Sequence, residues 1–357
     1  MNIGLVVHPY GEAKPSGLGK AIAEMVKALV ETDTDNTYTL YFKELPRTLP
    51  TIRGTWKAVA LKVKRLFFHA GVLNKSTEDL FVFFTPIIPL TFFPKKAVVV
   101  VHDLGFLRLP KKGLRAYAVA TILYFGYFIS LRKADKVIAV SEATKVDVCR
   151  YFKIRNDNVV VVHNGFTPPT VQAKAISCPE QFFLFAGALK ERKNVSRIID
   201  AFILFSKAHP SFCLLLVGKA EGSYVVMLRE KVKKAGLSEK IQFLGYVSDE
   251  ELAYLYSKAT AFVFPSLLEG FGLTILEAMS QGAPVITSNT GALAEVAGNS
   301  ALLVDPYSVA SITEGLTTIS ENEPLRATLI EKGKVRTGLF SWTSFGKGLK
   351  DVISALF

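Results

Sequence analysis

Two glutamates, Glu269 and Glu277, lie eight positions apart around a Gly-Phe-Gly turn at residues 270–272. A helix is predicted to begin near Leu273, so the two carboxylates bracket its N-terminus. Glycines at this point leave backbone amides accessible, and amides at a helix N-terminus bind phosphate. Carboxylates accept hydrogen bonds from hydroxyl groups. These groups together suit a ligand with hydroxyls at both ends and phosphates in the middle, which is the chemistry of a nucleoside diphosphate sugar.

Two adjacent cations, Arg192 and Lys193, lie in the segment GALKERKN, directly after an apolar run. Positive charge at a helix N-terminus opposes the helix dipole and costs about 0.3 to 1 kcal/mol. An anionic ligand would offset that cost, so the pair is a candidate phosphate contact. The alternative is a solvated helix start without a ligand.

The first half of the chain carries a similar set of residues. Gly17 and Gly19 precede a predicted helix, and His102 and Asp103 end an apolar run. The glycines also fit a plain strand-to-helix turn, and the histidine also fits a satisfied residue at a sheet edge. The nicotinamide-binding fingerprint needs a further glycine where Ile22 stands, which argues against a dehydrogenase.

Short apolar runs alternate with amphipathic segments along the whole chain. Runs this apolar are typical of parallel strands covered on both faces, and the pattern predicts two doubly wound α/β domains in series. Ligands bind such sheets beyond the carboxyl ends of the strands, so we expect the two domains to face each other across a cleft that collects the residues above. The expected strands are residues 3–7, 37–42, 80–84, 97–103, 136–141 and 158–165, then 182–187, 213–218, 241–245, 261–265, 284–288 and 301–305.

Length and composition bound the class of protein. A chain of 357 residues exceeds the size at which one core keeps growing, and 21% charged residues suit a globular protein. Cys149, Cys178 and Cys213 are scattered, which argues against a disulfide framework or a zinc site and predicts a reducing compartment. No secretory signal is expected. The Asp-x-Asp candidate, Asp33 and Asp35, falls in a polar turn, so no metal site is expected.

The net charge of +12 is concentrated in residues 51–150, which carry 17 Lys and Arg against 6 Asp and Glu. Such a face fits nucleic acid or an anionic membrane. Within it, WKAVALKVKRLFFHAGVL repeats apolar residues at three- and four-residue spacing among basic ones. This pattern predicts a basic amphipathic helix and favours the membrane; the alternative is a surface helix packed on its own core. The residues predicted to contact the membrane or an acceptor are Trp56, Lys57, Lys62, Lys64 and Arg65.

A second apolar segment, residues 116–131, contains sixteen uncharged residues between basic ones. A helix that spans a membrane needs about twenty. The segment therefore favours a buried or membrane-dipping helix over a true span.

The segment FVFPSLLEGFGLTILEAMSQGAPVITSNTGALAEVAG strongly resembles the sugar-nucleotide motif of the retaining group 1 (family 4) glycosyltransferases. Glu269 and Glu277 match that family's Glu-x7-Glu pair. PSGLGK, VVHDL, GALKERKN and LLVDP are similar to other family segments, so the resemblance covers nearly the whole chain. The chain departs from the pattern at Ser16, where the family often has glycine, and at Ala188, where many members have an arginine that Arg192 would replace.

The resemblance implies the GT-B fold, with two Rossmann-like domains facing across a cleft. The expected division is an acceptor-binding domain at residues 1–168, a linker at 169–180 and a nucleotide-sugar-binding domain at 181–340. A C-terminal helix at 341–357 is expected to pack back toward the first domain.

The resemblance also implies roles for single residues. Glu269 would hold hydroxyls of the donor sugar, and Glu277 would bind the ribose. Lys193, helped by Arg192, would neutralise the diphosphate, and His102 would face the sugar near the acceptor. The backbone and loop residues implied to contact the donor are Gly17, Gly19, Gly270, Phe271, Gly272 and Leu273.

The implied reaction is metal-independent transfer of a hexose with retention, without a cofactor beyond the nucleotide-sugar donor. RKN followed by FLGYVSDEELAYLY looks most like members that use GDP-mannose. The expected acceptor is a lipid-linked or growing polysaccharide at the inner face of the cytoplasmic membrane, and no nucleic-acid partner is expected. A UDP-sugar transferase of the same fold and a membrane-bound sugar-nucleotide binder without turnover remain alternatives.

Overall fold

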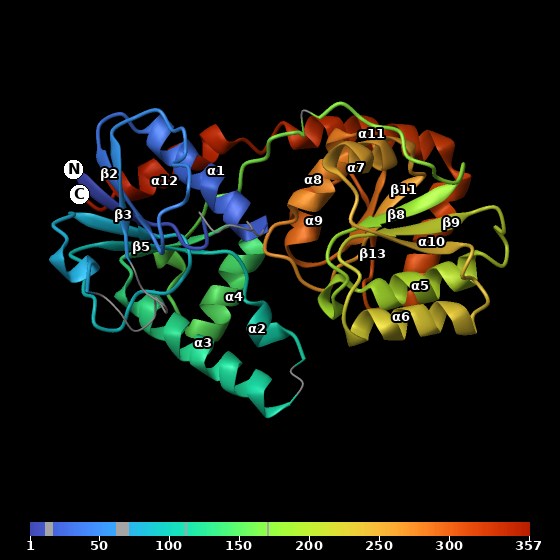
Figure 1. The fold of residues 1–357 in the computed structure, drawn as a ribbon, viewed down its shortest axis with the longest axis horizontal. Helices are drawn as coiled ribbons and strands as arrows, with labels where there is room; N and C mark the ends of the chain where they lie inside the picture. The colour runs from blue at the N-terminus through green and yellow to red at the C-terminus, as the bar shows by residue number, and fades with distance from the viewer. Residues whose placement is uncertain (11–16, 62–70, 111–112, 170) are drawn as a thin grey trace. The chain divides into compact units, whose positions relative to one another are not determined.

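The chain forms two compact units, each built on its own sheet. One unit comprises Met1–Gly165 with Phe340–Phe357, and the other comprises Phe166–Leu339. The sequence analysis ends the first domain at residue 168 and the second at residue 340, with a linker at 169–180 between them. The computed structural model describes residues 1–10, 17–61, 71–110, 113–169 and 171–357 (Figure 1).

The first unit contains a seven-stranded parallel sheet in the order β3-β2-β1-β4-β5-β6-β7. Its central strands are buried from end to end because helices cover both faces, which explains their unbroken apolar sequences. The strands are β1 (Asn2–Val6), β2 (Thr37–Phe42), β3 (Trp56–Ala60), β4 (Leu80–Phe83), β5 (Ala97–Val101), β6 (Lys136–Ala139) and β7 (Val159–Val161). The helices are α1 (Gly17–Thr32), α2 (Gly105–Arg108), α3 (Leu114–Lys133), α4 (Glu142–Phe152) and α12 (Trp342–Ser354).

The second unit contains a six-stranded parallel sheet in the order β10-β9-β8-β11-β12-β13. The strands are β8 (Phe182–Ala186), β9 (Cys213–Val217), β10 (Ile241–Gly245), β11 (Ala261–Phe264), β12 (Val285–Ser288) and β13 (Leu302–Val304). The helices are α5 (Val195–Phe205), α6 (Ser223–Lys234), α7 (Asp249–Lys258), α8 (Leu273–Ser280), α9 (Gly291–Ala297), α10 (Val309–Glu321) and α11 (Glu323–Thr337). Both units are therefore doubly wound, and every strand expected from the sequence is present.

Strand β3 corrects one prediction, because Trp56 and Lys57 belong to a strand and not to an amphipathic helix. Trp56 pairs with Tyr38 and Lys57 with Thr39 in parallel register along β2. The spacing of the apolar residues does not distinguish a helix from a strand over so short a segment. The segment forms a strand because it pairs with the free edge of β2. Residues 62–70, which include Lys62, Lys64 and Arg65, lie outside the described part of the chain.

Helix α3 contains the long apolar run and is only partly buried. Within the described residues it is the one helix long and apolar enough to cross a membrane, by length and composition alone, and 22% of its most apolar window is buried. Its C-terminal half packs on the core through Tyr124, Tyr127 and Phe128. Its N-terminal half exposes Leu114 (89%) and Ile122 (58%). Of the two predicted alternatives, a buried helix does not fit the first half of α3, whereas a membrane-dipping helix stays a prediction.

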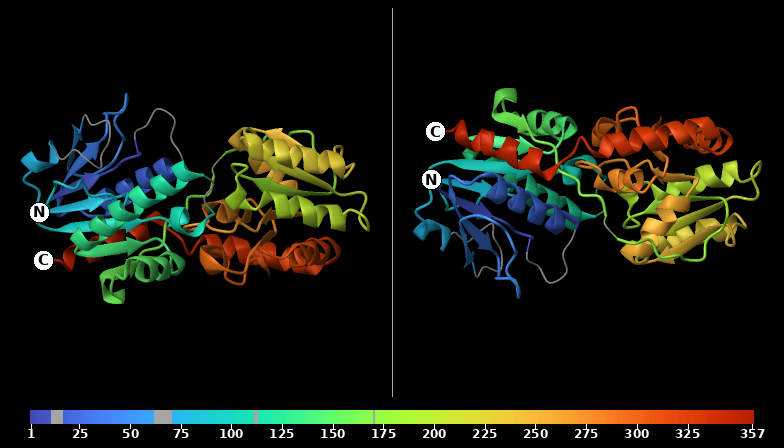
Figure 2. Two further views of the ribbon diagram at one scale, coloured as in Figure 1. Left: turned by 90° about the horizontal axis from the view of Figure 1, so that it is seen from below. Right: turned by 90° about the horizontal axis from the view of Figure 1, so that it is seen from above.

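The C-terminal helix α12 packs against α1, as the right view in Figure 2 shows for this unit. The two helices approach closely at Gly346, where any side chain would meet the backbone of Ala28. Lys350 then reaches the turn after α1, where its Nζ lies 3.4 Å from Asp33 Oδ1 and 2.9 Å from Asp35 Oδ2. The Asp-x-Asp pair thus anchors the end of the chain to the first unit.

Asp33 gives this anchor a pH dependence. Burial raises its pKa, but hydrogen bonds from Tyr38 Oη and Asn36 Nδ2, both at 2.6 Å, outweigh burial and hold the pKa below its ordinary value. A lowered carboxyl pKa stabilises the folded state above the unfolded-state pKa of about 3.9, and this stability is lost as the pH falls through the folded pKa.

We expect Asp33→Asn to lower the free energy of unfolding by about 2 kcal/mol at pH 7, the scale of a hydrogen bond to a charged group. The difference from the wild type should shrink below pH 4, as the wild-type carboxyl protonates. Urea unfolding at pH 7 and pH 3, followed by circular dichroism, measures both values. Equal differences at the two pH values would show that the charge of Asp33 contributes nothing.

Candidate active site

The candidate site lies where the strand order of the second sheet reverses, between β8 and β11. From β8 the chain continues to one side of the sheet and from β11 to the other, so their following loops leave a crevice where ligands bind in this class of sheet. The two loops are joined directly: Leu267 N donates to Arg192 O at 2.8 Å, and Arg192 Nη1 donates to Leu268 O at 3.0 Å.

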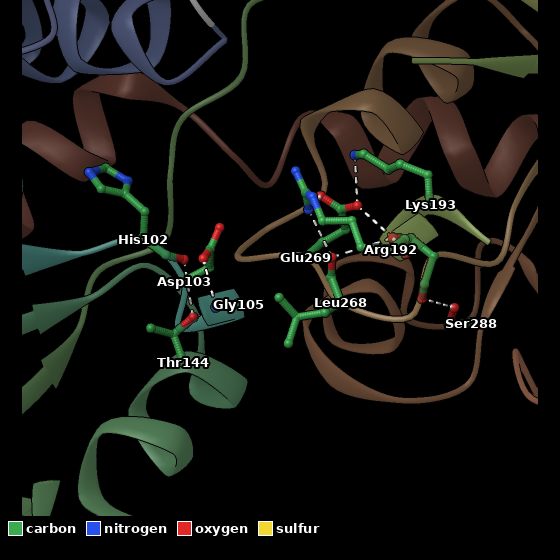
Figure 3. Close-up of polar contacts among 10 residues, drawn as sticks. His102, Asp103, Gly105, Thr144, Arg192, Lys193, Leu268, Glu269 and Ser288 are labelled. Carbon is green, nitrogen blue, oxygen red and sulfur yellow. Dashed lines mark hydrogen bonds and ion pairs between the residues drawn. The ribbon is translucent and has the colours of Figure 1, made fainter. Parts of the chain in front are cut away.

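Three of the predicted residues meet in this crevice, as Figure 3 shows. Lys193 Nζ lies 2.7 Å from Glu269 Oε1, and Arg192 Nη1 lies 3.2 Å from Glu269 Oε2. Ser266 Oγ donates to Glu269 Oε1 at 2.6 Å, and Lys193 Nζ also sits 4.6 Å from the centre of the Phe264 ring. Two cations against one carboxylate give the cluster a net positive charge, which suits an anionic ligand.

Burial makes this cluster electrostatically strong. The side chains of Lys193 and Glu269 are each 11% exposed, and that of Arg192 is 30% exposed. Charges with little contact to water interact more strongly with one another and with a bound anion. The exposed edge of Arg192 provides a cation that a ligand reaches from solvent.

Asn194 holds the cationic loop in place and was missed by the sequence analysis. It adopts a left-handed conformation with φ of 63°, and its Nδ2 donates to Pro265 O at 3.0 Å and Pro306 O at 2.6 Å. Arg197 Nη1 in turn donates to Asn194 Oδ1 at 2.9 Å. An asparagine directly before a helix is the available signal, since asparagine tolerates left-handed backbone better than most residues.

The Gly-Phe-Gly turn leads into α8, which begins at Leu273 as the sequence predicts. Gly272 has φ of 114°, and a Cβ there would also lie 2.7 Å from the side chain of Leu293. Only glycine fits both restrictions. Phe271 is buried beside Gly270, so its ring fixes the loop from the protein side.

Glu277 lies on the second turn of α8, in the same helix that the turn opens. Burial, and secondarily the charge of Glu277, raises the pKa of the Tyr256 hydroxyl on α7 well above its ordinary value. Among the described residues that hydroxyl has no hydrogen-bond partner. The structure therefore brings Arg192, Lys193 and Glu269 into contact and places Glu277 on the adjoining helix.

His102 follows β5 in the first unit, at the carboxyl end of the strands. Its Nε2 lies 2.8 Å from Phe84 O, and its own carbonyl accepts from Thr144 Oγ1 at 3.4 Å. Burial lowers the pKa of His102, and the Phe84 carbonyl and Asp103 offset this only in part. Because a carbonyl oxygen only accepts, Nε2 carries the proton and the neutral ring keeps Nδ1 as an acceptor.

Gly17 and Gly19 are the first and third residues of α1, whereas the sequence analysis placed them before the helix. A Cβ at Gly17 would meet nothing within 4 Å. Space around Gly17 is therefore open within the described structure, and residues 11–16 of the same segment lie outside it.

Two doubly wound parallel sheets, each in its own unit, are the architecture of the GT-B fold. The chain belongs to the group 1 glycosyltransferases. The family model described as "Glycosyl transferases group 1" matches residues 169–336, and the one described as "Glycosyltransferase Family 4" matches residues 72–168.

Curated relatives include two mannosyltransferases of Escherichia coli. O-antigen chain mannosyltransferase B is 28% identical over 70% of this chain and 67% of its own length. The serotype-specific mannosyltransferase WbdA is 28% identical over 73% of this chain and 34% of its own length. The match thus spans about a third of the second relative.

Solved structures extend the likeness to the whole chain. Sucrose-phosphate synthase from Thermosynechococcus elongatus superposes with a TM-score of 0.78 at 20% identity, covering 100% of this chain and 99% of that one. Anabaena HepE, in complex with UDP and glucose, superposes with a TM-score of 0.70 at 18% identity, covering 99% and 100%. At this level of identity the likeness establishes the fold.

Proposed function

We propose that the protein transfers a hexose, mannose from GDP-mannose, onto a lipid-linked or growing polysaccharide acceptor with retention of anomeric configuration. The observation that carries this proposal is the contact of Lys193 and Arg192 with Glu269 at the switch point of the second sheet. The mannosyltransferase relatives support the choice of sugar.

The chemistry follows from where charge develops. The bond between the anomeric carbon and the donor phosphate breaks, the acceptor oxygen bonds to the same face of that carbon, and the acceptor proton passes to the leaving phosphate. Lys193 and Arg192 neutralise the charge that the leaving diphosphate gains. Glu269 accepts hydrogen bonds from sugar hydroxyls, Glu277 from the ribose, and His102 offers Nδ1 to a sugar hydroxyl.

A nucleotide panel tests the donor. A ligand at 100 times its Kd stabilises the protein by about 2.7 kcal/mol, so thermal shifts with GDP, UDP and ADP at equal concentration rank the three bases. We expect the largest shift with GDP. A larger shift with UDP would favour the UDP-sugar transferase. Nucleotide binding without product from any lipid-linked acceptor would favour the non-catalytic binder.

We expect the reaction to need no metal. In this proposal Lys193 and Arg192 take the place of a metal ion at the diphosphate. Activity should survive excess EDTA in a radiolabelled-donor assay. Complete loss in EDTA, restored by manganese or magnesium, would contradict the metal-free reaction.

The proposed place of work is the inner face of the cytoplasmic membrane, with the protein bound peripherally. The excess of basic residues between positions 51 and 150 supports this, since each basic residue near an anionic surface contributes about 1 kcal/mol of attraction. Sedimentation with anionic but not neutral liposomes, reversed by high salt, is the expected result.

A further inference from the structure

Helices α2 and α3 enclose an open, mostly apolar groove on the first unit. Its volume is about 520 Å³. The α2 side contributes Phe106, Leu109 and Pro110, and the α3 side contributes Val119, Ala120 and Leu123. Such a groove has the lining of a site for a hydrocarbon chain.

The surface of α3 beside the groove is also apolar. A helix that faces only water typically carries polar side chains on its exposed face. Tyr117, Val119 and Ile122 are 49 to 58% exposed, all on the N-terminal half of α3. This half extends past α2 in Figure 1. A groove that adjoins exposed apolar side chains is a candidate binding site for an apolar ligand.

Charge favours a lipid that carries phosphate. Among the described residues that line the groove, Arg115 carries the charge, and the sequence of α3 contains no acidic residue. Arg115 forms no ion pair with another residue in the described ranges. Guanidinium groups bind phosphate through two parallel hydrogen bonds.

The groove also adjoins the predicted acceptor side of the first unit. Helix α2 begins at Gly105, whose N–H donates to Asp103 Oδ1 at 2.9 Å. His102 directly precedes Asp103 in the chain. One short connection therefore joins the apolar lining to the histidine at the end of β5.

We propose that this groove binds the apolar chain of a lipid-linked acceptor, with Arg115 contacting the phosphate that joins the chain to its sugar. The inference rests on the proposed function, because it assigns a place to the acceptor of that transfer. The acceptor class is a polyprenyl-type or acyl lipid phosphate, whose sugar end then lies on the side of His102.

Farnesyl phosphate is a suitable probe, and isothermal titration calorimetry with the full chain measures its binding. We expect Val119→Gln to weaken binding about tenfold, the equivalent of roughly 1.4 kcal/mol of lost apolar contact. Ile122→Gln is the matched control, since Ile122 is equally apolar and exposed on the same helix but does not line the groove. It should bind like the wild type.

Arg115→Gln separates the phosphate contact from the apolar one. We expect it to weaken binding of farnesyl phosphate by tenfold or more and to leave binding of farnesol unchanged. With an acceptor of full chain length, Val119→Gln should raise KM and leave kcat unchanged.

Three outcomes would overturn the assignment of the groove to the lipid chain. The first is that farnesyl phosphate shows no saturable binding. The second is that Val119→Gln and Ile122→Gln weaken binding equally, which indicates a surface that faces a bilayer, and the third is that light scattering shows a dimer that Val119→Gln dissociates. Nucleotide thermal shifts distinguish failure of the proposed function from failure of the lipid-binding proposal. Binding of farnesyl phosphate without binding of any nucleotide would overturn the proposed transferase function but support lipid binding in the groove.

Discussion

Lys193→Ala should reduce turnover by about 100-fold or more, the scale seen when one electrostatic group at a site of developing charge is lost. Lys193 Nζ lies 2.7 Å from Glu269 and has little contact with water, so solvent screens its charge only weakly from a neighbouring diphosphate. Affinity for the intact nucleotide-sugar donor should fall less, because the diphosphate gains its additional charge only as the bond to the sugar breaks. Steady-state kinetics with a purified acceptor, together with titration of the intact donor in the absence of acceptor, measures the two effects.

Lys231→Ala is the matched control for this variant. Lys231 also pairs with a carboxylate in the second unit, with Nζ 2.7 Å from Asp200 Oδ2, and its side chain is 26% exposed. It lies on α6 and not on the loops at the switch point. We expect this variant to lower the melting temperature without changing kcat. An unchanged kcat for Lys193→Ala would remove Lys193 from the mechanism.

Glu269→Gln should lower kcat/KM by about 100-fold while the fold persists. The amide keeps the shape of the carboxylate, but it loses the charge that holds Lys193 and Arg192 and one of the two acceptor oxygens for sugar hydroxyls. Charge-assisted hydrogen bonds are about twice as strong as neutral ones. Initial rates across donor concentrations and a melting curve of the variant test both parts.

Glu251→Gln provides the comparison. Glu251 accepts from Ser248 N at 3.0 Å in the capping box of α7, and glutamine fills the same position in such caps. We expect full activity from it. If Glu269→Gln kept its activity and lost only stability, Glu269 would be a structural partner of the two cations and not a contact of the sugar.

Much of the fold could be read from the sequence, because parallel strands covered on both faces have continuous apolar runs. Leu80–Phe83 and Cys213–Val217 are examples, since both are buried throughout. Strand β3 was misread because its sequence, with Lys57 between Trp56 and Ala58, is that of a half-buried edge. Helix and strand spacing cannot be distinguished over so few residues, and only the free edge of β2 selects one.

The sequence by itself was enough to predict the residues that we propose carry the chemistry: the Glu-x7-Glu pair, the Arg-Lys pair and the histidine at a strand end. Tertiary structure decided that Glu269 contacts both Arg192 and Lys193, which are more than 70 positions away. It also decided that Asn194 anchors their loop and that half of α3 is exposed. Side-chain type and local spacing are properties of a short segment, whereas contacts between loops and the burial of a helix depend on which strands become neighbours in the sheet.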